Sequence, residues 1–320
     1  MQNKPIHSST QLIDKAIAIA NDGRIKKIVV AAAQDADVLD AVVQAKADNF
    51  IEPILVGDRD KIIALSDNHQ IDVTDIEILD KPDISESAHT AIQLASEGKA
   101  DAVMKGFLPT SLLLKTLLDS KYGLRGNPIL SHCAVMDIPG YHKLLNLTDG
   151  GMMVHPDTQQ KKEIANNAIL VSKALMLSPI KIAVSSAYDK IYHSQEQVKE
   201  DHEILIPYIS KNYKDIIAQS PIPFDTAVSK KLQELRSNEN DVDGDADIFL
   251  ASSIEECNII AKSLIHFAHA VFAGVIVGAK VPVSLVSRSD TVRNKKASLA
   301  LSCVLADYYK MNNIWGDTNA

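Results

Sequence analysis

AGVIVGAKVPVSLVSRSD, residues 273–290, is the stretch that decides the predicted fold. It contains most of two apolar runs, residues 271–277 and 282–286, which are rich in β-branched side chains. Unbroken apolar runs of this length are typical of strands buried in a parallel sheet. The polar residues 287–290 follow directly, and apolar residues then recur at helical spacing over 291–310. The polar run is therefore expected between the carboxyl end of a strand and the amino end of a helix, where open α/β sheets bind ligands.

This junction has the chemistry of an anion site. The free N–H groups at the amino end of a helix attract negative charge, and the guanidinium of Arg288 suits a phosphate or a carboxylate. Ser289, Asp290 or Thr291 is available to cap the helix. An ordinary strand-to-helix turn with solvated Arg288 and Asp290 would have the same sequence, so this alternative stays open.

The composition predicts a globular protein with two domains. At 320 residues the chain exceeds the size of a comfortable single core. Hydrophobic residues make up 46% and charged residues 23%, as in ordinary soluble proteins. The formal net charge of -8 argues against a nucleic-acid-binding surface. The first ten residues, MQNKPIHSST, lack the apolar segment of a secretion signal, so we expect a cytoplasmic protein without a membrane partner.

The sequence predicts neither disulfides nor a metal site. Its three cysteines, Cys133, Cys257 and Cys303, are scattered among apolar residues and are expected to be buried. The aspartates of residues 241–247 do not fit an EF-hand, because the register that places Gly244 sixth ends on a leucine. We therefore interpret residues 237–245 as an acidic surface loop.

Strands and helices alternate along the chain, which predicts mostly parallel sheets covered by helices. Two of the strands, residues 129–136 and 143–147, are so close in sequence that an antiparallel pair is expected. The expected strands are residues 27–32, 53–57, 76–79, 101–104, 129–136, 143–147, 180–184, 215–218, 247–250, 271–277 and 282–286.

The turn sequence Thr148-Asp149-Gly150-Gly151 interrupts this alternation and suggests a domain boundary. We expect one α/β domain to comprise residues 1–148 together with 291–320. The second α/β domain is expected to comprise residues 149–290. The last helix is assigned to the first domain because a terminal helix that follows the ligand-binding strand can cross back.

Several motifs in a fixed order resemble the phosphate acetyltransferase and phosphate butyryltransferase family. One such motif would be weak, but the ordered set is specific. The motifs are Lys105-Gly106 with Thr110, LSHCAVMDIPGYHKLLNLTDGGMMVHPD (130–157), PIPFDTAVS (221–229), GDADIFL (244–250), Asn258 with Lys262, and AGVIVGAKVPVSLVSR (273–288).

The resemblance implies a fold, a reaction and an assembly. The fold is a two-domain α/β/α architecture of the isocitrate and isopropylmalate dehydrogenase type, with mostly parallel sheets and an interdomain cleft. The reaction exchanges the acyl group of a short-chain acyl-CoA, such as acetyl-CoA or butyryl-CoA, with inorganic phosphate to give an acyl phosphate and CoA. Coenzyme A is a co-substrate and no permanently bound cofactor is implied. A homodimer or a higher homo-oligomer is expected.

The resemblance also implies three catalytic residues. Arg288 matches the phosphate-binding arginine of the family, and Ser287 matches the serine that hydrogen-bonds the oxyanion or the sulfur. In the acetyltransferase branch a carboxylate one turn into the following helix takes the proton of the CoA thiol. That position is Asn294 here, and the nearest carboxylate is Asp290. Asp290 is therefore the candidate base, with a helix cap as the equally weighted alternative.

Seven further residues match substrate-binding positions of the family. Each also has an ordinary structural interpretation: a solvated strand end for the lysine, a surface arginine, a buried strand position, or a helix cap for the aspartate and the asparagine. The neighbouring His132 is interpreted as a core histidine. The predicted substrate-binding residues are Lys105, Gly106, Thr110, Arg125, Ser131, Asp225 and Asn258.

Three departures from the family pattern keep other functions open. Met153, Cys257 and Ser220 stand where relatives usually carry Asn, Gly and Gly. They allow a CoA-ester or acyl phosphate binding protein of the same fold with little turnover. A metal-dependent decarboxylating dehydrogenase of the same fold is a further alternative, although no spaced aspartates of metal-site order are visible.

Because no Ser or Cys is paired by spacing with a His and an acid, we expect direct transfer in a ternary complex.

Overall fold

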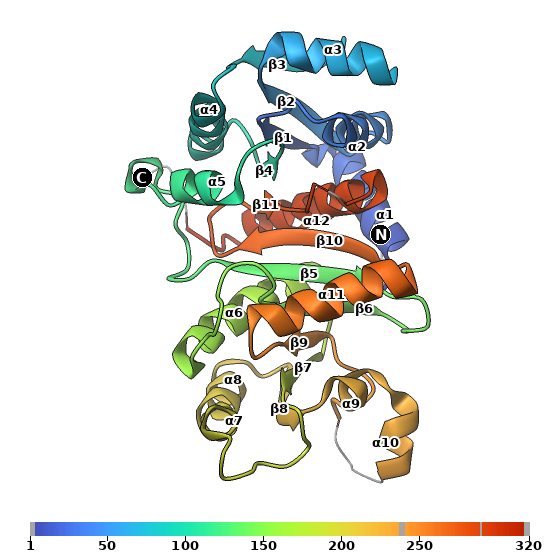
Figure 1. Cartoon of the computed structure of the whole chain (residues 1–320), viewed down its shortest axis with the longest axis vertical. Coiled ribbons are helices and arrows are strands. Elements are labelled where there is room, and N and C mark those ends of the chain that lie inside the picture. Colours follow the sequence, from blue (N-terminus) through green and yellow to red (C-terminus); the bar gives the residue numbers. More distant parts are fainter. Residues whose placement is uncertain (1–3, 237–240, 289, 317–320) are drawn as a thin grey trace. The chain divides into compact units, whose positions relative to one another are not determined.

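The computed structural model describes residues 4–236, 241–288 and 290–316, and the chain forms two compact units. The first, here called the terminal unit, comprises residues 9–126 together with residues from 273 onward. The second, the central unit, comprises residues 127–272 together with the chain up to Ser8. Both are α/β units in which helices cover a mostly parallel sheet (Figure 1).

The sheet of the terminal unit has the strand order β3-β2-β1-β4-β11-β10. All neighbours are parallel except β10 and β11, which are antiparallel. The strands are β1 (Lys26–Ala31), β2 (Ile51–Gly57), β3 (Glu77–Asp80), β4 (Ala102–Lys105), β10 (Val271–Val277) and β11 (Val283–Ser284).

Helices of the terminal unit begin where the strands end, and aspartates fix three of these starts. The side chains of Asp35, Asp58 and Asp83 accept hydrogen bonds from backbone N–H groups in the first turns of α2, α3 and α4. Such caps satisfy donors that a helix leaves unpaired. The helices are α1 (Ser9–Ile19), α2 (Ala36–Ala47), α3 (Arg59–His69), α4 (Ile84–Ser96), α5 (Thr110–Leu117) and α12 (Val292–Met311).

The sheet of the central unit has the order β5-β6-β9-β7-β8, and only β5 and β6 are antiparallel. The antiparallel pair expected from the sequence is therefore confirmed. The strands are β5 (Ser131–Asp137), β6 (Leu144–Thr148), β7 (Ile180–Ser185), β8 (Ile216–Ile222) and β9 (Ile248–Leu250). The helices are α6 (Thr158–Ala174), α7 (Glu196–Glu200), α8 (Ile206–Asn212), α9 (Phe224–Val228), α10 (Lys230–Arg236) and α11 (Ile254–Ala268).

The prediction of two buried parallel strands in residues 271–286 was wrong for β10. β11 does pair in parallel with β4, but β10 runs antiparallel to β11. Gly278 follows β10 with a φ of 104°, a conformation that glycine adopts without strain. A short connection through such a glycine returns the chain beside itself, which is possible only for an antiparallel pair.

The boundaries of the two compact units differ from the predicted domain boundaries, which were placed after residues 148 and 290. Residues 127–148 belong to the central unit because β6 pairs with β9. Residues 273–290 belong to the terminal unit because β11 pairs with β4. The last helix, α12, belongs to the terminal unit together with residues 9–126.

The acidic segment near residue 243 is not the surface loop that we expected. Residues 237–240 lie outside the described part of the chain, but Asp243 is 2% exposed and Val242 is fully buried. Asp245 forms ion pairs with Lys143 and Lys181, at 3.1 and 2.7 Å. The cationic partners come from residues distant in sequence, so the sequence alone could not reveal them. The three cysteines are buried and free, as predicted.

Candidate active site

The turn between β11 and α12 is built by hydrogen bonds within the predicted site. The backbone N–H of Ser287 donates to Asp290 Oδ2 at 2.6 Å, and the N–H of Asp290 donates to the carbonyl of Ser287 at 3.1 Å. Thr291 is the cap of α12, because its side chain accepts from the N–H of Asn294 at 3.2 Å. Asp290 thus closes the turn rather than capping the helix. Ser289, the other predicted cap, lies outside the described residues.

Arg288 is exposed and rests on an aromatic ring. Its guanidinium carbon lies 4.4 Å from the centroid of Phe107. A guanidinium that stacks on a ring by its face keeps its N–H groups available at its edge. This arrangement orients the arginine for an anion while restricting its rotamers.

Lys105 brings a second cation to the same edge of the sheet. It is the last residue of β4 and is 8% exposed. Burial lowers the pKa of Lys105, the positive charges of Arg288 and Lys295 lower it further, and Asp35 opposes them. Because these charges act on one another, an anion bound among them would relieve their mutual repulsion.

Lys295 is a residue that the sequence analysis missed. It lies in the first turns of α12 with only 1% of its surface exposed. Its Nζ donates to the backbone carbonyl of Asp290 and, at 3.4 Å, to that of Arg288, and it lies 3.7 Å from Asp37 Oδ2. These hydrogen bonds therefore fix the backbone that carries the Arg288 side chain. The sequence feature that could have revealed Lys295 is a lysine at a position where the helical pattern expects an apolar residue.

Gly106 and Thr110 place the β4–α5 loop beside this site. The N–H groups of Gly106 and Phe107 donate to the carbonyls of Ala31 and Ala32, at 2.9 and 2.6 Å. A Cβ on Gly106 would lie 2.2 Å from the Ala32 oxygen, so only glycine permits this approach. Thr110 is the first residue of α5 and is half-buried. The loop thereby fixes the ring that supports Arg288.

Arg125 also lies in the terminal unit, and its side chain is exposed. Its backbone forms an antiparallel bridge with Ala279, in the connection between β10 and β11. The bridge fixes the position of its backbone. The proposed contact with CoA remains a prediction.

Ser131 is buried inside the central unit. Its side chain is 0% exposed and accepts a hydrogen bond from Asn167 Nδ2 at 2.9 Å. The same nitrogen donates to the carbonyl of Ile129 at 3.0 Å. Ser131 is thus part of a polar network that joins α6 to the start of β5. Its predicted contact with substrate has no support in this geometry.

Asp225 and Asn258 lie in the first turns of two helices of the central unit. Asp225 is exposed in α9, and its Oδ1 accepts from the N–H of Thr226 at 2.8 Å. Asn258 in α11 donates through Nδ2 to the carbonyl of Gly150 at 2.7 Å. Asn258 therefore fixes the glycine turn that follows β6.

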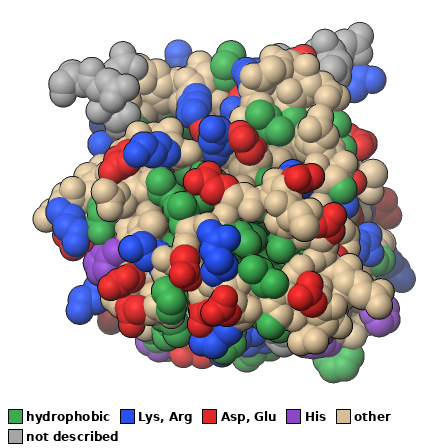
Figure 2. All heavy atoms as spheres, turned by 90° about the horizontal axis from the view of Figure 1, so that it is seen from above, with side chains coloured by type: hydrophobic (Ala, Val, Ile, Leu, Met, Phe, Trp, Pro, Cys, Tyr) green, Lys and Arg blue, Asp and Glu red, His purple; other side chains and the backbone are tan. Residues whose placement is uncertain are grey.

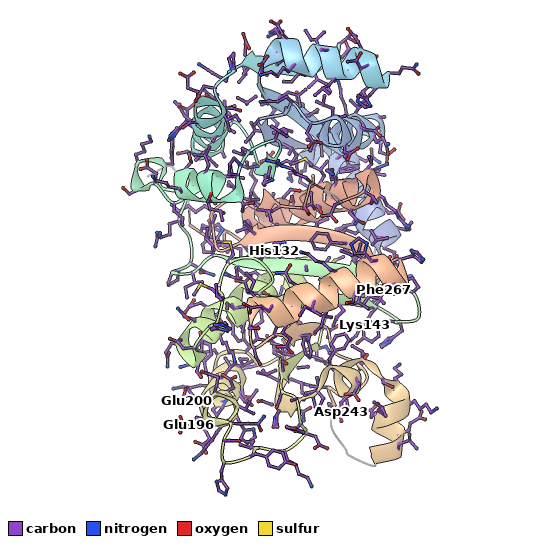
Figure 3. All side chains as sticks on the ribbon, viewed as in Figure 1. His132, Lys143, Glu196, Glu200, Asp243 and Phe267 are labelled. Atoms are coloured by element: carbon purple, nitrogen blue, oxygen red, sulfur yellow. The ribbon has the colours of Figure 1, made fainter. Side chains whose placement is uncertain are left out.

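Asp149, in that glycine turn, was treated only as part of a domain boundary. It is 2% exposed, and its carboxylate accepts hydrogen bonds from four backbone N–H groups, of His132, Gly151, Met152 and Met153, at 2.8 to 3.1 Å. Burial raises the pKa of Asp149 to about 6, and the N–H groups oppose this rise. The sequence feature that could have revealed Asp149 is a carboxylate followed by two glycines at the end of a predicted strand. His132 itself is buried on β5 (Figure 3), as expected of a core histidine.

The described residues contain no group of three His, Cys, Asp or Glu side chains placed to hold a metal ion. On the face seen in Figure 2, acidic and basic side chains are interspersed. The cations that act on one another in the site are Lys105, Arg288 and Lys295. Within the described part of the chain, every helix is too short or too polar to cross a lipid bilayer.

The family model described as Phosphate acetyl/butaryl transferase matches residues 81–303. The chain belongs to the phosphate acetyl/butyryltransferase family. The resemblance noted from the motifs is thus confirmed, and with it the class of enzyme, a phosphate acyltransferase.

Relatives in both branches of the family align over nearly their whole length. The chain is 34% identical over 282 residues to the phosphate butyryltransferase of Clostridium acetobutylicum, covering 88% of this chain and 94% of the relative. It is 36% identical to the probable phosphate butyryltransferase of Bacillus subtilis, with 89% and 94% covered. It is 32% identical to the phosphate acetyltransferase of Thermotoga maritima, with 92% and 99% covered.

Solved structures agree with the family assignment. The branched-chain phosphotransacylase from Enterococcus faecalis superposes with a TM-score of 0.78 at 28% identity, covering 88% of this chain and 99% of that chain. A phosphotransacetylase from Streptococcus pyogenes gives a TM-score of 0.75 at 17% identity, with 93% and 98% covered, and shows the likeness of fold alone.

Proposed function

We propose that this member of the family transfers a short acyl group between coenzyme A and inorganic phosphate at the site around Arg288. The observation that carries this proposal is the guanidinium stacked on Phe107 beside the buried Lys105, at the carboxyl edge of the sheet of the terminal unit. Two cations at such an edge suit an oxyanion, and the guanidinium fork suits phosphate in particular.

In the proposed reaction a phosphate oxygen attacks the thioester carbonyl carbon. The new carbon–oxygen bond forms, the carbon–sulfur bond breaks, and the proton of hydrogen phosphate passes to the departing sulfur, giving CoA thiol and acyl phosphate. Arg288 positions the phosphate, Lys105 supplies charge, and Ser287 donates to the oxyanion or to the sulfur. No residue needs to carry the acyl group in this scheme, so transfer occurs in a ternary complex.

Asp290 remains the candidate base for the reverse direction, in which the CoA thiol must lose a proton. One carboxylate oxygen, Oδ2, accepts from the N–H of Ser287. A carboxylate keeps further lone pairs when it accepts one hydrogen bond, so this contact orients Asp290 without occupying it fully. Asn294, at the family's carboxylate position, is 3% exposed and carries no titratable group.

Phosphate-dependent thiol release across a series of acyl-CoAs tests the function. We expect release with acetyl-, propionyl-, butyryl- or branched acyl-CoA only when phosphate is present, and intersecting initial-rate lines. Parallel lines or a trapped acyl-enzyme would contradict direct transfer. Tight CoA-ester binding without release from any acyl-CoA would instead support a binding protein of the same fold.

Three further predictions accompany this function. The isocitrate and isopropylmalate dehydrogenase type of architecture and the homo-oligomeric state remain predictions from the resemblance, and the cytoplasmic location remains a prediction from the composition of the first residues. Likewise, the roles of Arg125, Asp225 and Asn258 in binding substrates are proposals. Substitution of each by alanine, with saturation curves for CoA and for phosphate measured separately, assigns each role.

A further inference from the structure

Lys105 differs from the other buried lysines of the described residues in its partners. Each of the other four has a carboxylate oxygen 2.5 to 3.7 Å from Nζ. These pairs are Lys26 with Asp307, Lys143 with Asp247, Lys161 with Asp201, and Lys295 with Asp37. In the described part of the chain Lys105 forms no ion pair, and its Nζ donates only to the carbonyl of Gly106, at 3.4 Å.

The surroundings of Lys105 favour the uncharged amine. Burial lowers its pKa most, and the charge of Arg288 lowers it further; Asp35 raises it, and Lys295 lowers it. Asp35 is already engaged, because its Oδ1 accepts from the backbone N–H of Val38 at 3.0 Å. A desolvated lysine beside other cations keeps more neutral amine than a lysine in solvent, and the neutral amine is a nucleophile.

The proposed reaction delivers an activated acyl group to the same place. An acyl phosphate is a mixed anhydride, whose carbonyl carbon reacts with amines. Lys105 and Phe107 flank Gly106, and Phe107 carries the guanidinium of Arg288 on its ring. If Arg288 holds the phosphoryl group, the carbonyl carbon follows after one bridging oxygen, so the amine meets it at a high effective concentration. Lys105 is 8% exposed, against 1% for Lys295, so it is not completely enclosed.

We propose that Lys105 is a modification site at which the protein acylates itself with acyl phosphate, an inference that rests on the proposed function. The neutral Nζ attacks the carbonyl carbon and a carbon–nitrogen bond forms. The bond from that carbon to the bridging oxygen breaks, its electron pair leaves with the phosphate, and one N–H proton passes to the phosphate. The products are an amide on Lys105 and hydrogen phosphate. The amide is neutral, so the site loses a cation and the enzyme is slowed.

A lysine that serves only as a fixed charge would have other contacts. Lys295 is such a lysine: its Nζ donates to the carbonyls of Arg288 and Asp290 and lies 3.7 Å from Asp37 Oδ2. These acceptors favour the ammonium form of Lys295. The single long hydrogen bond of Lys105 does so much less.

Mass spectrometry of the full-length protein after incubation with synthetic acetyl phosphate, without CoA, measures acylation at each lysine. Lys115 is the internal comparison, because it is exposed on α5 and forms no ion pair with the residues that the structure describes. We expect early occupancy at Lys105 to exceed that at Lys115 by about tenfold or more. Inorganic phosphate should slow acylation of Lys105 and leave Lys115 unaffected. Equal or greater occupancy at Lys115, or no protection of Lys105 by phosphate, would overturn the proposal.

Removal of the phosphoryl anchor tests the geometry. Arg288→Ala should slow acylation of Lys105 by about fivefold or more, because acyl phosphate is no longer positioned beside the amine. The matched control is Arg293→Ala, which removes an exposed arginine from the first turns of α12 and should leave the rate unchanged. An unchanged rate in Arg288→Ala, or an equal decrease in both variants, would contradict the proposal.

The consequence for activity is tested with Lys105→Arg, which keeps the charge but has no amine of lowered pKa. During incubation with acetyl phosphate, wild type should lose activity in proportion to the occupancy of Lys105. Lys105→Arg should keep whatever activity it has at the start. Loss of activity at the same rate in both proteins would contradict inactivation through Lys105.

Synthetic acetyl phosphate separates this inference from the proposed function. Protein that exchanges acyl groups between CoA and phosphate but leaves Lys105 unmodified defeats this inference alone. Protein that is acylated at Lys105 but releases no thiol from any acyl-CoA defeats the proposed function and leaves the reactive lysine in place. Modification by acetyl-CoA without phosphate, but not by acetyl phosphate, would overturn the choice of acyl donor.

Discussion

Arg288 is the residue on which the proposed chemistry depends most. Its guanidinium is held against Phe107, so a phosphate would meet a fork of donors whose orientation is already set. We expect Arg288→Ala to lower kcat by on the order of a hundredfold, because both positioning and charge stabilisation are lost. Arg288→Lys should restore little, since an ammonium cannot bind two phosphate oxygens in the same way. Steady-state rates at saturating phosphate give the kcat of each variant for comparison with wild type.

Arg293→Ala is the matched control for that experiment. Arg293 is an exposed arginine in the first turns of the same helix. Its removal should leave kcat within about twofold of wild type if only Arg288 touches phosphate. Full activity of a folded Arg288→Ala variant would defeat the assignment of the phosphate site.

Asp149 gives the central unit a pH-dependent stability. Because burial raises its pKa from 3.8 to about 6, the protonated form is favoured in the folded state. The stabilising contribution is complete below pH 3.8 and is lost as the pH rises through about 6. Compared with Asp149→Asn, wild type should lose about 3 kcal/mol of unfolding free energy over this range.

Urea unfolding at several pH values, followed for wild type and Asp149→Asn, measures that difference. Asp225→Asn corrects for the loss of one negative charge, because Asp225 is exposed in the same unit. If wild type instead gains stability relative to Asp149→Asn as the pH rises, the four N–H groups outweigh burial and the carboxylate is the favoured form.

At the scale of the element, α12 positions the site through its amino end. Lys295, in its first turns, holds the carbonyls of Arg288 and Asp290, whereas the next residue, Lys296, forms an ion pair with Asp48 at 2.6 Å. In Lys295→Met we expect the Michaelis constant for phosphate to rise by on the order of tenfold, because the backbone that carries Arg288 loses its anchor. The Michaelis constant for CoA should change little.

Lys296→Met is the neighbouring control, since it removes a lysine from the same helix without touching those carbonyls. A merely structural role of Lys295 would lower the melting temperature without separating phosphate saturation from CoA saturation. Equal changes in both Michaelis constants would therefore contradict its positioning role.

At the scale of the whole molecule, we predict a homodimer or a higher homo-oligomer. Helix α11 supports this expectation, because Cys257 is its one buried residue while Ile259 is 66% and Phe267 is 86% exposed. Phe267 projects from the end of that helix (Figure 3). Large apolar side chains exposed on one helix are typical of a surface that another chain covers.

Light scattering at working concentration should give at least twice the monomer mass of 34.8 kDa. Phe267→Ser should shift the equilibrium toward the monomer, and His266→Ser, at the adjacent exposed position, should not. A monomer mass for wild type would contradict the prediction.

Much of the fold follows from local sequence patterns. The alternation of apolar runs and helical periodicity predicted each strand of both sheets to within a few residues. The motif Ser287–Arg288 was likewise identified beside a strand end, and Lys105 at the end of β4. Periodicity, caps and short motifs depend on neighbours in the chain, so they can be recognised without the tertiary structure.

The sequence by itself therefore determined the α/β class, the family and two cationic residues of the candidate site, Lys105 and Arg288. Only the tertiary structure decided the antiparallel sense of β10, the burial of Ser131 and the anchoring role of Lys295. Each of these depends on groups that lie far apart in the chain and meet only in the folded state. Apolar strands of either sense have the same composition, and a lysine carries no mark of the carbonyls that it will reach.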